Sequence, residues 1–149
     1  MTQPATILVC DDEAAIRSIV ATKLRAAGYT VCEGRNGLEG YCWVDHSALP
    51  VGSLPKSRMP IVPDLVVTDL QMPMMSGLEM AIKLREFAAT AHVPIIMLTA
   101  RGYIAAAEDL AKANIRYLMP KPFGAAQLLE RVQNFLASSS GGHANRAAA

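Results

Sequence analysis

Short apolar runs alternate along the chain with segments in which apolar residues recur every three or four positions. The runs at 6–10, 64–69 and 93–98 are mainly apolar, as is typical of strands that are covered on both faces of a sheet. Weaker strand patterns lie at 29–33 and 115–119. The pattern therefore predicts five short strands.

Amphipathic helices are predicted between these strands. In residues 14–27 the apolar positions recur at helical spacing, and Gly28 follows as a C-terminal cap. Ser76 lies three residues before Glu79, which is the spacing of a capping box at the start of a helix. Four further segments share the helical pattern, namely 38–45, 76–89, 103–113 and a last segment around Leu128, Val132 and Phe135.

The regular alternation of strand and helix predicts the fold class. Strands that are separated by helices pair in parallel, and the helices then cover both faces of the sheet. We expect a doubly wound α/β domain with a five-stranded parallel sheet between two layers of helices. Ligands in such domains bind at the carboxyl ends of the strands, which gives the expected location of the functional site.

Two segments depart from this alternation. Residues 46–63 contain four prolines and exceed the typical connection of about 4–6 residues, so an extended loop is predicted there. A tolerated insertion is the preferred interpretation of this loop, and mobility or a partner contact is the alternative. Residues 138–149 are of low complexity and are expected to form a disordered tail, which leaves residues 1–137 as the domain.

The composition limits the possible partners. A chain of 149 residues that is 52% hydrophobic suffices for one domain with a single core. Its net charge of +1, without a run of basic residues, gives no reason to expect nucleic acid or an anionic membrane as a partner. No apolar segment approaches the ~20 residues that span a bilayer. A cytoplasmic protein is therefore expected.

Side chains suited to phosphate chemistry follow the predicted strands. Carboxylates that converge at one sheet edge repel one another, so they require a cation or raised pKa values, and Mg²⁺ prefers oxygen ligands. A lysine and a threonine hydroxyl would add charge and a donor for phosphoryl oxygens, and a carboxylate can itself accept a phosphoryl group. The residues that combine these properties are Asp11, Asp12, Asp69, Thr99 and Lys121.

Four motifs, taken in this order, resemble the receiver domain of two-component response regulators, the family of the bacterial chemotaxis regulator. The resemblance covers residues 5–137 and implies a flavodoxin-like fold with the strand order 2-1-3-4-5. The motifs are Leu8-Val9-Cys10-Asp11-Asp12-Glu13, Thr68-Asp69-Leu70-Gln71-Met72-Pro73 with Ser76-Gly77, Leu98-Thr99-Ala100 and Lys121-Pro122-Phe123.

The resemblance implies a chemical role for Asp69. This residue would accept a phosphoryl group from a sensor histidine kinase or a histidine phosphotransfer protein. The protein would be a signalling domain that catalyses only its own phosphorylation and dephosphorylation, and not an enzyme in the usual sense. Mg²⁺ would be held by Asp11, Asp12, Asp69 and the backbone carbonyl of Gln71.

The same resemblance implies how the phosphoryl group would be sensed. Thr99 and Lys121 would contact the phosphoryl oxygens, and the peptide bond between Lys121 and Pro122 would be cis. Members usually carry an aromatic residue three positions before the lysine, but Leu118 stands there in this chain. The switch is therefore expected to act mainly through the backbone of residues 100–103.

Two further expectations concern the fifth strand. Tyr117 precedes Leu118 and should point to the opposite face of the sheet, because successive side chains of a strand alternate. Pro120 has no backbone donor, so it fits only an edge strand or a strand end. The fifth strand is thus expected to be outermost.

The preferred functional interpretation is a single-domain response regulator that is a monomer or a weak homodimer and acts by binding a downstream protein. A receiver excised from a hybrid histidine kinase or a larger regulator is the alternative. A Mg-dependent phosphatase with an aspartate nucleophile would share the sheet, but it requires an acid two residues after the nucleophile, where this chain has Gln71. A flavin binder is disfavoured because Asp11-Asp12-Glu13 would repel the flavin phosphate.

Overall fold

The computed structural model describes residues 3–48, 60–100 and 107–148. Within these ranges all strand pairings are parallel, and they join five strands in the order β2-β1-β3-β4-β5, which confirms the predicted sheet. The strands are β1 Thr6–Cys10, β2 Thr30–Gly34, β3 Leu65–Asp69, β4 Ile95–Thr99 and β5 Ile115–Pro120.

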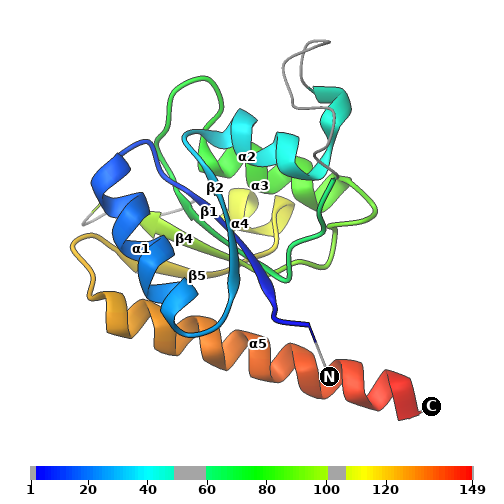
Figure 1. The fold of residues 1–149 in the computed structure, drawn as a ribbon. Helices are drawn as coiled ribbons and strands as arrows, with labels where there is room; N and C mark the ends of the chain where they lie inside the picture. The colour runs from blue at the N-terminus through cyan, green and yellow to red at the C-terminus, as the bar shows by residue number, and fades with distance from the viewer. Residues whose placement is uncertain (1–2, 49–59, 101–106, 149) are drawn as a thin grey trace.

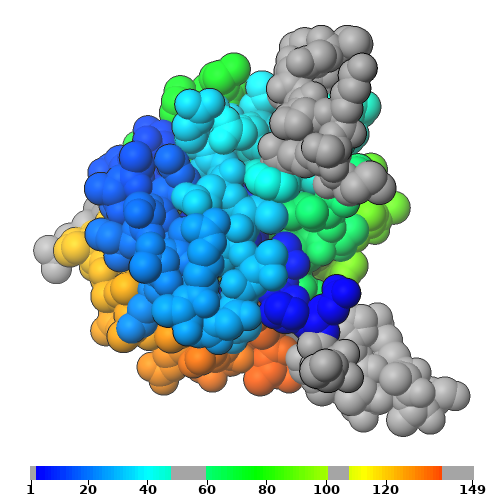
Figure 2. Space-filling view, viewed as in Figure 1, coloured from blue at the N-terminus to red at the C-terminus, as the bar shows by residue number. Residues whose placement is uncertain are grey.

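Helices cover both faces of the sheet (Figure 1). Helices α1 and α5 lie on one face and pack against each other, and Figure 2 shows them side by side at the surface. Helices α2 and α3 lie on the other face, and α4 lies beside α3 (Figure 1). Their bounds are α1 Ala14–Ala26, α2 Gly37–Val44, α3 Gly77–Glu86, α4 Ala107–Lys112 and α5 Ala125–Ala148, and a short 3₁₀ helix η1 spans His46–Ala48.

The central strands are buried on both faces, as their mainly apolar sequences predict. Every residue of β3 and β4 is buried. Side chains of β1 alternate between the two cores, so that Ile7 and Val9 pack with α1 and α5 whereas Leu8 and Cys10 pack with α2 and α3. The sheet is therefore rigidly held at its centre, where β1 and β3 end.

The start of α3 follows the predicted capping box. The hydroxyl of Ser76 accepts a hydrogen bond from the amide of Glu79 at 3.1 Å, and the Glu79 carboxylate accepts one from the amide of Ser76 at 3.5 Å. Helix α2 begins one residue earlier than predicted, because the side chain of Asn36 accepts a 2.8 Å hydrogen bond from the Glu39 amide and caps it. Helix α3 ends at Glu86, three residues before the predicted end, because Phe87 adopts an extended backbone.

The structure differs from the expected disordered tail at 138–149. Helix α5 continues through these residues to Ala148. Its first half is anchored in the core by Leu128, Val132 and Leu136. Extending an existing helix costs far less than nucleating one, so the helix can continue from the anchored part of α5.

The predicted long loop is described only at its two ends. Residues 46–48 form η1, and the Ile61 amide donates a 2.9 Å hydrogen bond to the carbonyl of Trp43 at the end of α2. The Asp64 amide donates to the carbonyl of Thr6 at 2.8 Å, so the loop returns to the amino end of β1. This end of the sheet is opposite the carboxyl ends of the strands, and residues 49–59 lie outside the described residues.

Strand β5 lies at the sheet edge with Pro120 as its last residue, as predicted. Tyr117 packs against the core of α1 and α5, and Leu118 packs against the opposite core, which confirms that they face opposite sides. The register against β4 shifts at one point, where Ile115 and Tyr117 pair with successive residues and Arg116 is the extra residue of a β-bulge.

No helix within the described ranges is both long and apolar enough to cross a membrane. The backbone of residues 101–103, through which the switch is expected to act, also lies outside the described residues.

Candidate functional site

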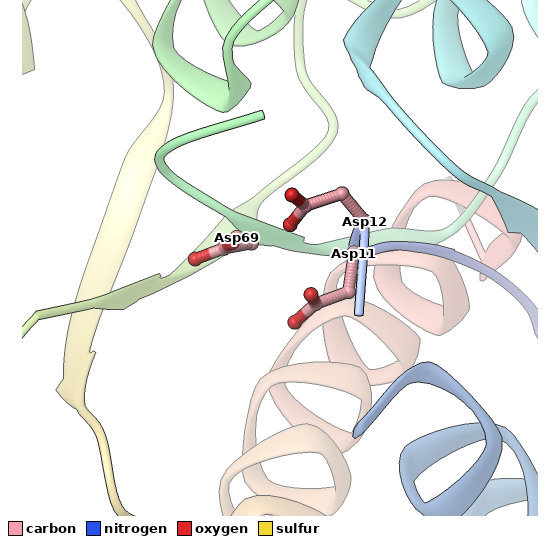
Figure 3. A group of neighbouring side chains, drawn as sticks. All are labelled: Asp11, Asp12 and Asp69. Atoms are coloured by element: carbon pink, nitrogen blue, oxygen red, sulfur yellow. The ribbon is translucent and has the colours of Figure 1, made fainter. Parts of the chain in front are cut away.

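The parallel pairing of β1 with β3 brings three aspartates together. Asp11 and Asp12 directly follow β1, and Asp69 is the last residue of β3. One carboxylate oxygen from each residue lies within 4.8 Å of the others (Figure 3). The convergence expected from the strand ends is therefore present in the structure.

Lys121 connects these carboxylates. Its Nζ lies 3.3 Å from Asp11 Oδ2, 3.3 Å from Asp69 Oδ1 and 3.7 Å from Glu13 Oε1. The Lys121 amide donates a 2.7 Å hydrogen bond to the carbonyl of Thr99, which ties the end of β5 to the end of β4. The peptide bond between Lys121 and Pro122 is cis, as the resemblance implied.

The backbone around Asp69 holds its carboxylate in place. The Leu70 amide donates a 3.0 Å hydrogen bond to Asp69 Oδ1, and the Gly77 amide donates to the Leu70 carbonyl at 2.9 Å. A Cβ atom at position 77 would collide with the Asp69 carbonyl oxygen and would lie 3.0 Å from Thr68 Oγ1. Glycine is therefore required where α3 begins against the end of β3.

Asp11 is fixed through its backbone and its side chain. Its amide donates to the Gly34 carbonyl at 3.1 Å, and its carbonyl accepts a 2.8 Å hydrogen bond from Arg17 Nη1. Its Oδ1 accepts a 2.9 Å hydrogen bond from the Glu13 amide. Asp11 is 1% exposed, whereas Asp12 is exposed to solvent. The acidic loop thus combines a buried, fixed carboxylate with an accessible one.

The electrostatics of the site favour a divalent cation. Burial, together with the neighbouring Asp11 charge, raises the pKa of Asp69 from 3.8 to about 6, although Lys121 acts in the opposite direction. Burial also raises the pKa of Asp11. For Lys121, burial disfavours the charged form, but Asp11 and Asp69 outweigh it, so the pKa of Lys121 lies above its usual value. The single positive charge of Lys121 does not balance the negative charges of the three carboxylates. A set of oxygen ligands of this kind suits Mg²⁺.

The site is open to ligands. A cavity of about 300 Å³ lies at the strand ends, and Asp12, Asp69, Gln71 and Lys121 contribute to its wall. Because the cavity borders the exposed Asp12, a hydrated ion and a phosphoryl group have access to the carboxylates.

The raised pKa of Asp69 predicts a pH-dependent stability difference in metal-free protein. The folded-state value lies above 3.8, so the stability that protonated Asp69 provides is present below pH 3.8 and is lost as the pH rises through about 6. The side chain that Asp69→Asn introduces is uncharged at every pH. In the presence of a chelator at pH 8, we expect the free energy of unfolding of this variant to exceed that of the wild type by about 1–2 kcal/mol. This gain is smaller than the raised pKa of Asp69 alone implies, because Lys121 loses an ion-pair partner.

Urea unfolding at pH 4, 6 and 8 measures this difference, which should nearly vanish at the lowest pH. Glu108→Gln removes an exposed carboxylate from α4 and serves as the control, for which little pH-dependent gain is expected. A constant difference between Asp69→Asn and wild type across the three pH values would contradict the assigned electrostatics.

The structure gathers most of the predicted site residues around one cavity. Thr99 ends β4 and is buried, and its carbonyl is bound to the Lys121 amide. Sequence reasoning assigned no role to Glu13 and Arg17, which contact Lys121 and Asp11 respectively. Glu13 belongs to the same acidic run, and Arg17 is a basic residue in the first turn of a helix, where the helix dipole disfavours it. Both signals were present in the sequence.

Comparisons with known proteins identify the family to which the chain belongs. A family model described as "Response regulator receiver domain" matches residues 7–133. The DNA-binding dual master transcriptional regulator RpaA of Synechocystis sp. is 32% identical over 130 residues, which cover 87% of this chain and 48% of that protein. The phosphate regulon transcriptional regulatory protein PhoB of Pseudomonas aeruginosa is 31% identical over 131 residues, covering 88% of this chain and 51% of that protein. The chain thus spans about half the length of these curated relatives.

A segment of the sensor histidine kinase TmoS of Ectopseudomonas mendocina is 38% identical over 84 residues, which cover 56% of this chain and 9% of the kinase. Among solved structures, the chemotaxis protein CheY4 of Vibrio cholerae superposes with a TM-score of 0.73 at 25% identity, covering 89% of this chain and 98% of that one. The family model covers most of the chain, and the acidic cluster is compatible with the Mg²⁺ that receiver domains bind. The chain therefore belongs to the response regulator receiver domains of two-component systems.

Proposed function

We propose that this receiver domain accepts a phosphoryl group on Asp69 in a Mg-dependent reaction, with a histidine kinase or a histidine phosphotransfer protein as the donor. The observation that carries the proposal is the contact of Lys121 Nζ with both Asp11 and Asp69 at 3.3 Å, beside a cavity that borders Asp12. A cation thus already lies where the charge of an incoming phosphoryl group would develop.

The reaction forms an acyl phosphate. A carboxylate oxygen of Asp69 attacks the phosphorus atom, and the phosphorus–nitrogen bond of the donor phosphohistidine breaks with its electron pair leaving on the imidazole nitrogen. Asp69 Oδ1 is engaged by the Leu70 amide and by Lys121, so we infer that the other carboxylate oxygen is the nucleophile. Deprotonated Asp69 is required, and the pKa of about 6 leaves it mostly charged at neutral pH.

The residues around Asp69 have distinct roles in this proposal. Asp11, Asp12, Asp69 and the carbonyl of Gln71 would hold Mg²⁺, which neutralises charge on the phosphoryl oxygens. Lys121 would move its contact from the Asp69 carboxylate to the transferred phosphoryl group. The Thr99 hydroxyl, at the adjacent strand end, would donate to a phosphoryl oxygen and so couple phosphorylation to the segment that follows β4.

The domain would pass on its signal through contact with another protein. We propose binding to a downstream protein, with the free domain a monomer or a weak homodimer. A receiver unit within a larger transcriptional regulator is a second candidate, because the chain matches only about half of RpaA and PhoB. A phosphatase is not favoured, since Gln71, which lines the cavity, cannot act as a general acid.

Incubation with Mg²⁺ and a small acyl phosphate donor tests the proposal. Intact-mass spectrometry should show the addition of one phosphoryl group, which hydroxylamine removes because it cleaves acyl phosphates. Chelation of Mg²⁺ should prevent the addition. Absence of an adduct, or an adduct that resists hydroxylamine, would overturn the proposed function.

The role of Asp12 in metal binding gives a second test. Asp12→Ala removes the accessible carboxylate of the cluster, so Mg²⁺ affinity should fall by about tenfold or more, and the phosphorylation rate at limiting Mg²⁺ should fall with it. Titration of Mg²⁺ by calorimetry measures the affinity. Glu108→Ala, at an exposed position of α4, should bind as the wild type does. An unchanged titration of Asp12→Ala would remove this residue from the metal site.

A further inference from the structure

Arg17 occupies an unusual position for a basic residue. It lies in the first turn of α1, where the positive end of the helix dipole disfavours a cation. Its side chain is nevertheless held at 16% exposure by contacts outside the helix. Tertiary interactions must therefore offset the cost of this location.

The contacts of Arg17 link the acidic loop to strand β2. Arg17 Nε lies 3.4 Å from Glu33 Oε1, and Arg17 Nη1 donates a 2.8 Å hydrogen bond to the carbonyl of Asp11. Glu33 belongs to β2 and pairs in register with Val9 of β1. One guanidinium thus joins two neighbouring strands at the point where β1 enters the site.

The carbonyl that Arg17 contacts belongs to the peptide unit between Asp11 and Asp12. Because a peptide unit is planar, holding its carbonyl sets the direction in which the chain leaves Asp11 toward Asp12. The preceding peptide unit is held as well, since the Asp11 amide donates to the Gly34 carbonyl at 3.1 Å. Both peptide units that flank Asp11 are therefore fixed by β2 and α1.

We propose that Arg17, oriented by Glu33, is a positioning residue that holds the Asp11–Asp12 peptide in the geometry required for cation binding. The inference rests on the proposed Mg-dependent function and extends it to a residue that touches neither the cation nor the phosphoryl group. Arg17 acts through the Asp11 carbonyl, and Glu33 acts through Arg17.

The direction in which Mg²⁺ affinity changes when Arg17 is replaced distinguishes a positioning role from a purely electrostatic one. Arg17 is a positive charge near a cation site, so a purely electrostatic role predicts that its removal strengthens Mg²⁺ binding. Positioning predicts the opposite, because the released Asp11–Asp12 peptide must be ordered again when the ion binds. The two roles cannot give the same result.

The chain offers a matched control in Arg25. This residue also pairs with Glu33, with its Nη1 3.1 Å from Oε2, but its Nη2 donates to the Val31 carbonyl at 3.0 Å and not to the acidic loop. Arg25→Met therefore removes an arginine from the same glutamate without releasing Asp11. Arg17→Lys keeps the charge but loses the fork that reaches two acceptors at once.

Mg²⁺ titrations followed by backbone amide chemical shifts test the proposal. Arg17→Met should bind Mg²⁺ about tenfold more weakly than the wild type, as is usual when support of a metal ligand is lost. Arg17→Lys should be intermediate, and Arg25→Met should be close to the wild type. In metal-free protein, hydrogen exchange of the Glu13 amide, which is bonded to Asp11 Oδ1, should accelerate in Arg17→Met but not in Arg25→Met.

Glu33→Gln, which retains an acceptor for Arg17 without its charge, provides a milder variant and should weaken Mg²⁺ binding less than Arg17→Met does. Unchanged or tighter binding by Arg17→Met, or equal weakening by Arg25→Met, would overturn the positioning role. Failure of the wild type to bind Mg²⁺ would instead overturn the proposed function, so the two failures are distinguishable.

Discussion

Asp69→Asn should take up no phosphoryl group from either a small acyl phosphate or a phosphorylated kinase. The amide is not a nucleophile toward phosphorus, whereas the fold is expected to remain intact because the substitution is nearly isosteric and removes a carboxylate whose charged form burial disfavours. Intact-mass spectrometry after incubation with Mg²⁺ and donor measures the loss. Urea unfolding of the same sample shows whether the variant is folded.

Asp64→Asn is the matched control for this experiment. Asp64 directly precedes β3, at the opposite end of the strand from Asp69, and it is exposed. Its replacement should leave phosphorylation at the wild-type rate. Labelling of Asp69→Asn at that same rate would show that another residue is the acceptor.

Gly77→Ala is expected to lower both stability and phosphorylation. The added methyl group would collide with the Asp69 carbonyl oxygen, which belongs to the rigid end of a fully buried strand, so the start of α3 and the β3–α3 turn must shift. Overpacking of this kind costs about 1–3 kcal/mol, which exceeds the gain of about 1 kcal/mol from the helix propensity of alanine. The free energy of unfolding should therefore fall by up to about 2 kcal/mol. Because the turn contains Leu70 and Gln71, the phosphorylation rate should fall as well.

Gly124→Ala serves as the control, since Gly124 directly precedes α5 and accepts a backbone hydrogen bond from Leu128. A Cβ atom there would come no closer than 3.6 Å to its neighbours, so no collision adds to the cost of alanine at this N-cap position, and the free energy of unfolding should fall by less than it does in Gly77→Ala. Equal effects of the two substitutions in urea unfolding would contradict the steric explanation for Gly77.

The sequence predicted those features that depend on neighbouring residues. Mainly apolar runs identified β3 and β4 because these strands are buried on both faces. Parallel pairing then implied that the acids at the strand ends meet, and the cluster around Asp69 has this arrangement. The capping box of Ser76 was recognisable because its partner lies three residues away.

Features that depend on distant contacts were not predictable in this way. The pairing of Arg17 with Glu33 joins α1 to β2 through side-chain geometry that no local pattern encodes. One local signal was overlooked as well: α2 starts at Gly37 with Asn36 as its cap, but the apolar pattern, and not the cap, was used to locate the helix. The disordered tail was predicted from composition alone. Composition does not show that the preceding part of α5 is anchored in the core before the chain reaches Ser138.

Because of the bulge at Arg116, the position of Lys121 does not depend strictly on the length of the connection before β5. Ile115 faces the same core as Leu118 although they are three positions apart, because the extra residue absorbs one step of the strand. From Tyr117 to Pro120 each residue then pairs with its successive counterpart on β4. A residue gained or lost between α4 and β5 can thus be compensated where the strand begins, and the lysine stays in phase with the aspartates. The bulge thus confines the irregular pairing to the start of the outer strand and leaves its end in regular register with β4.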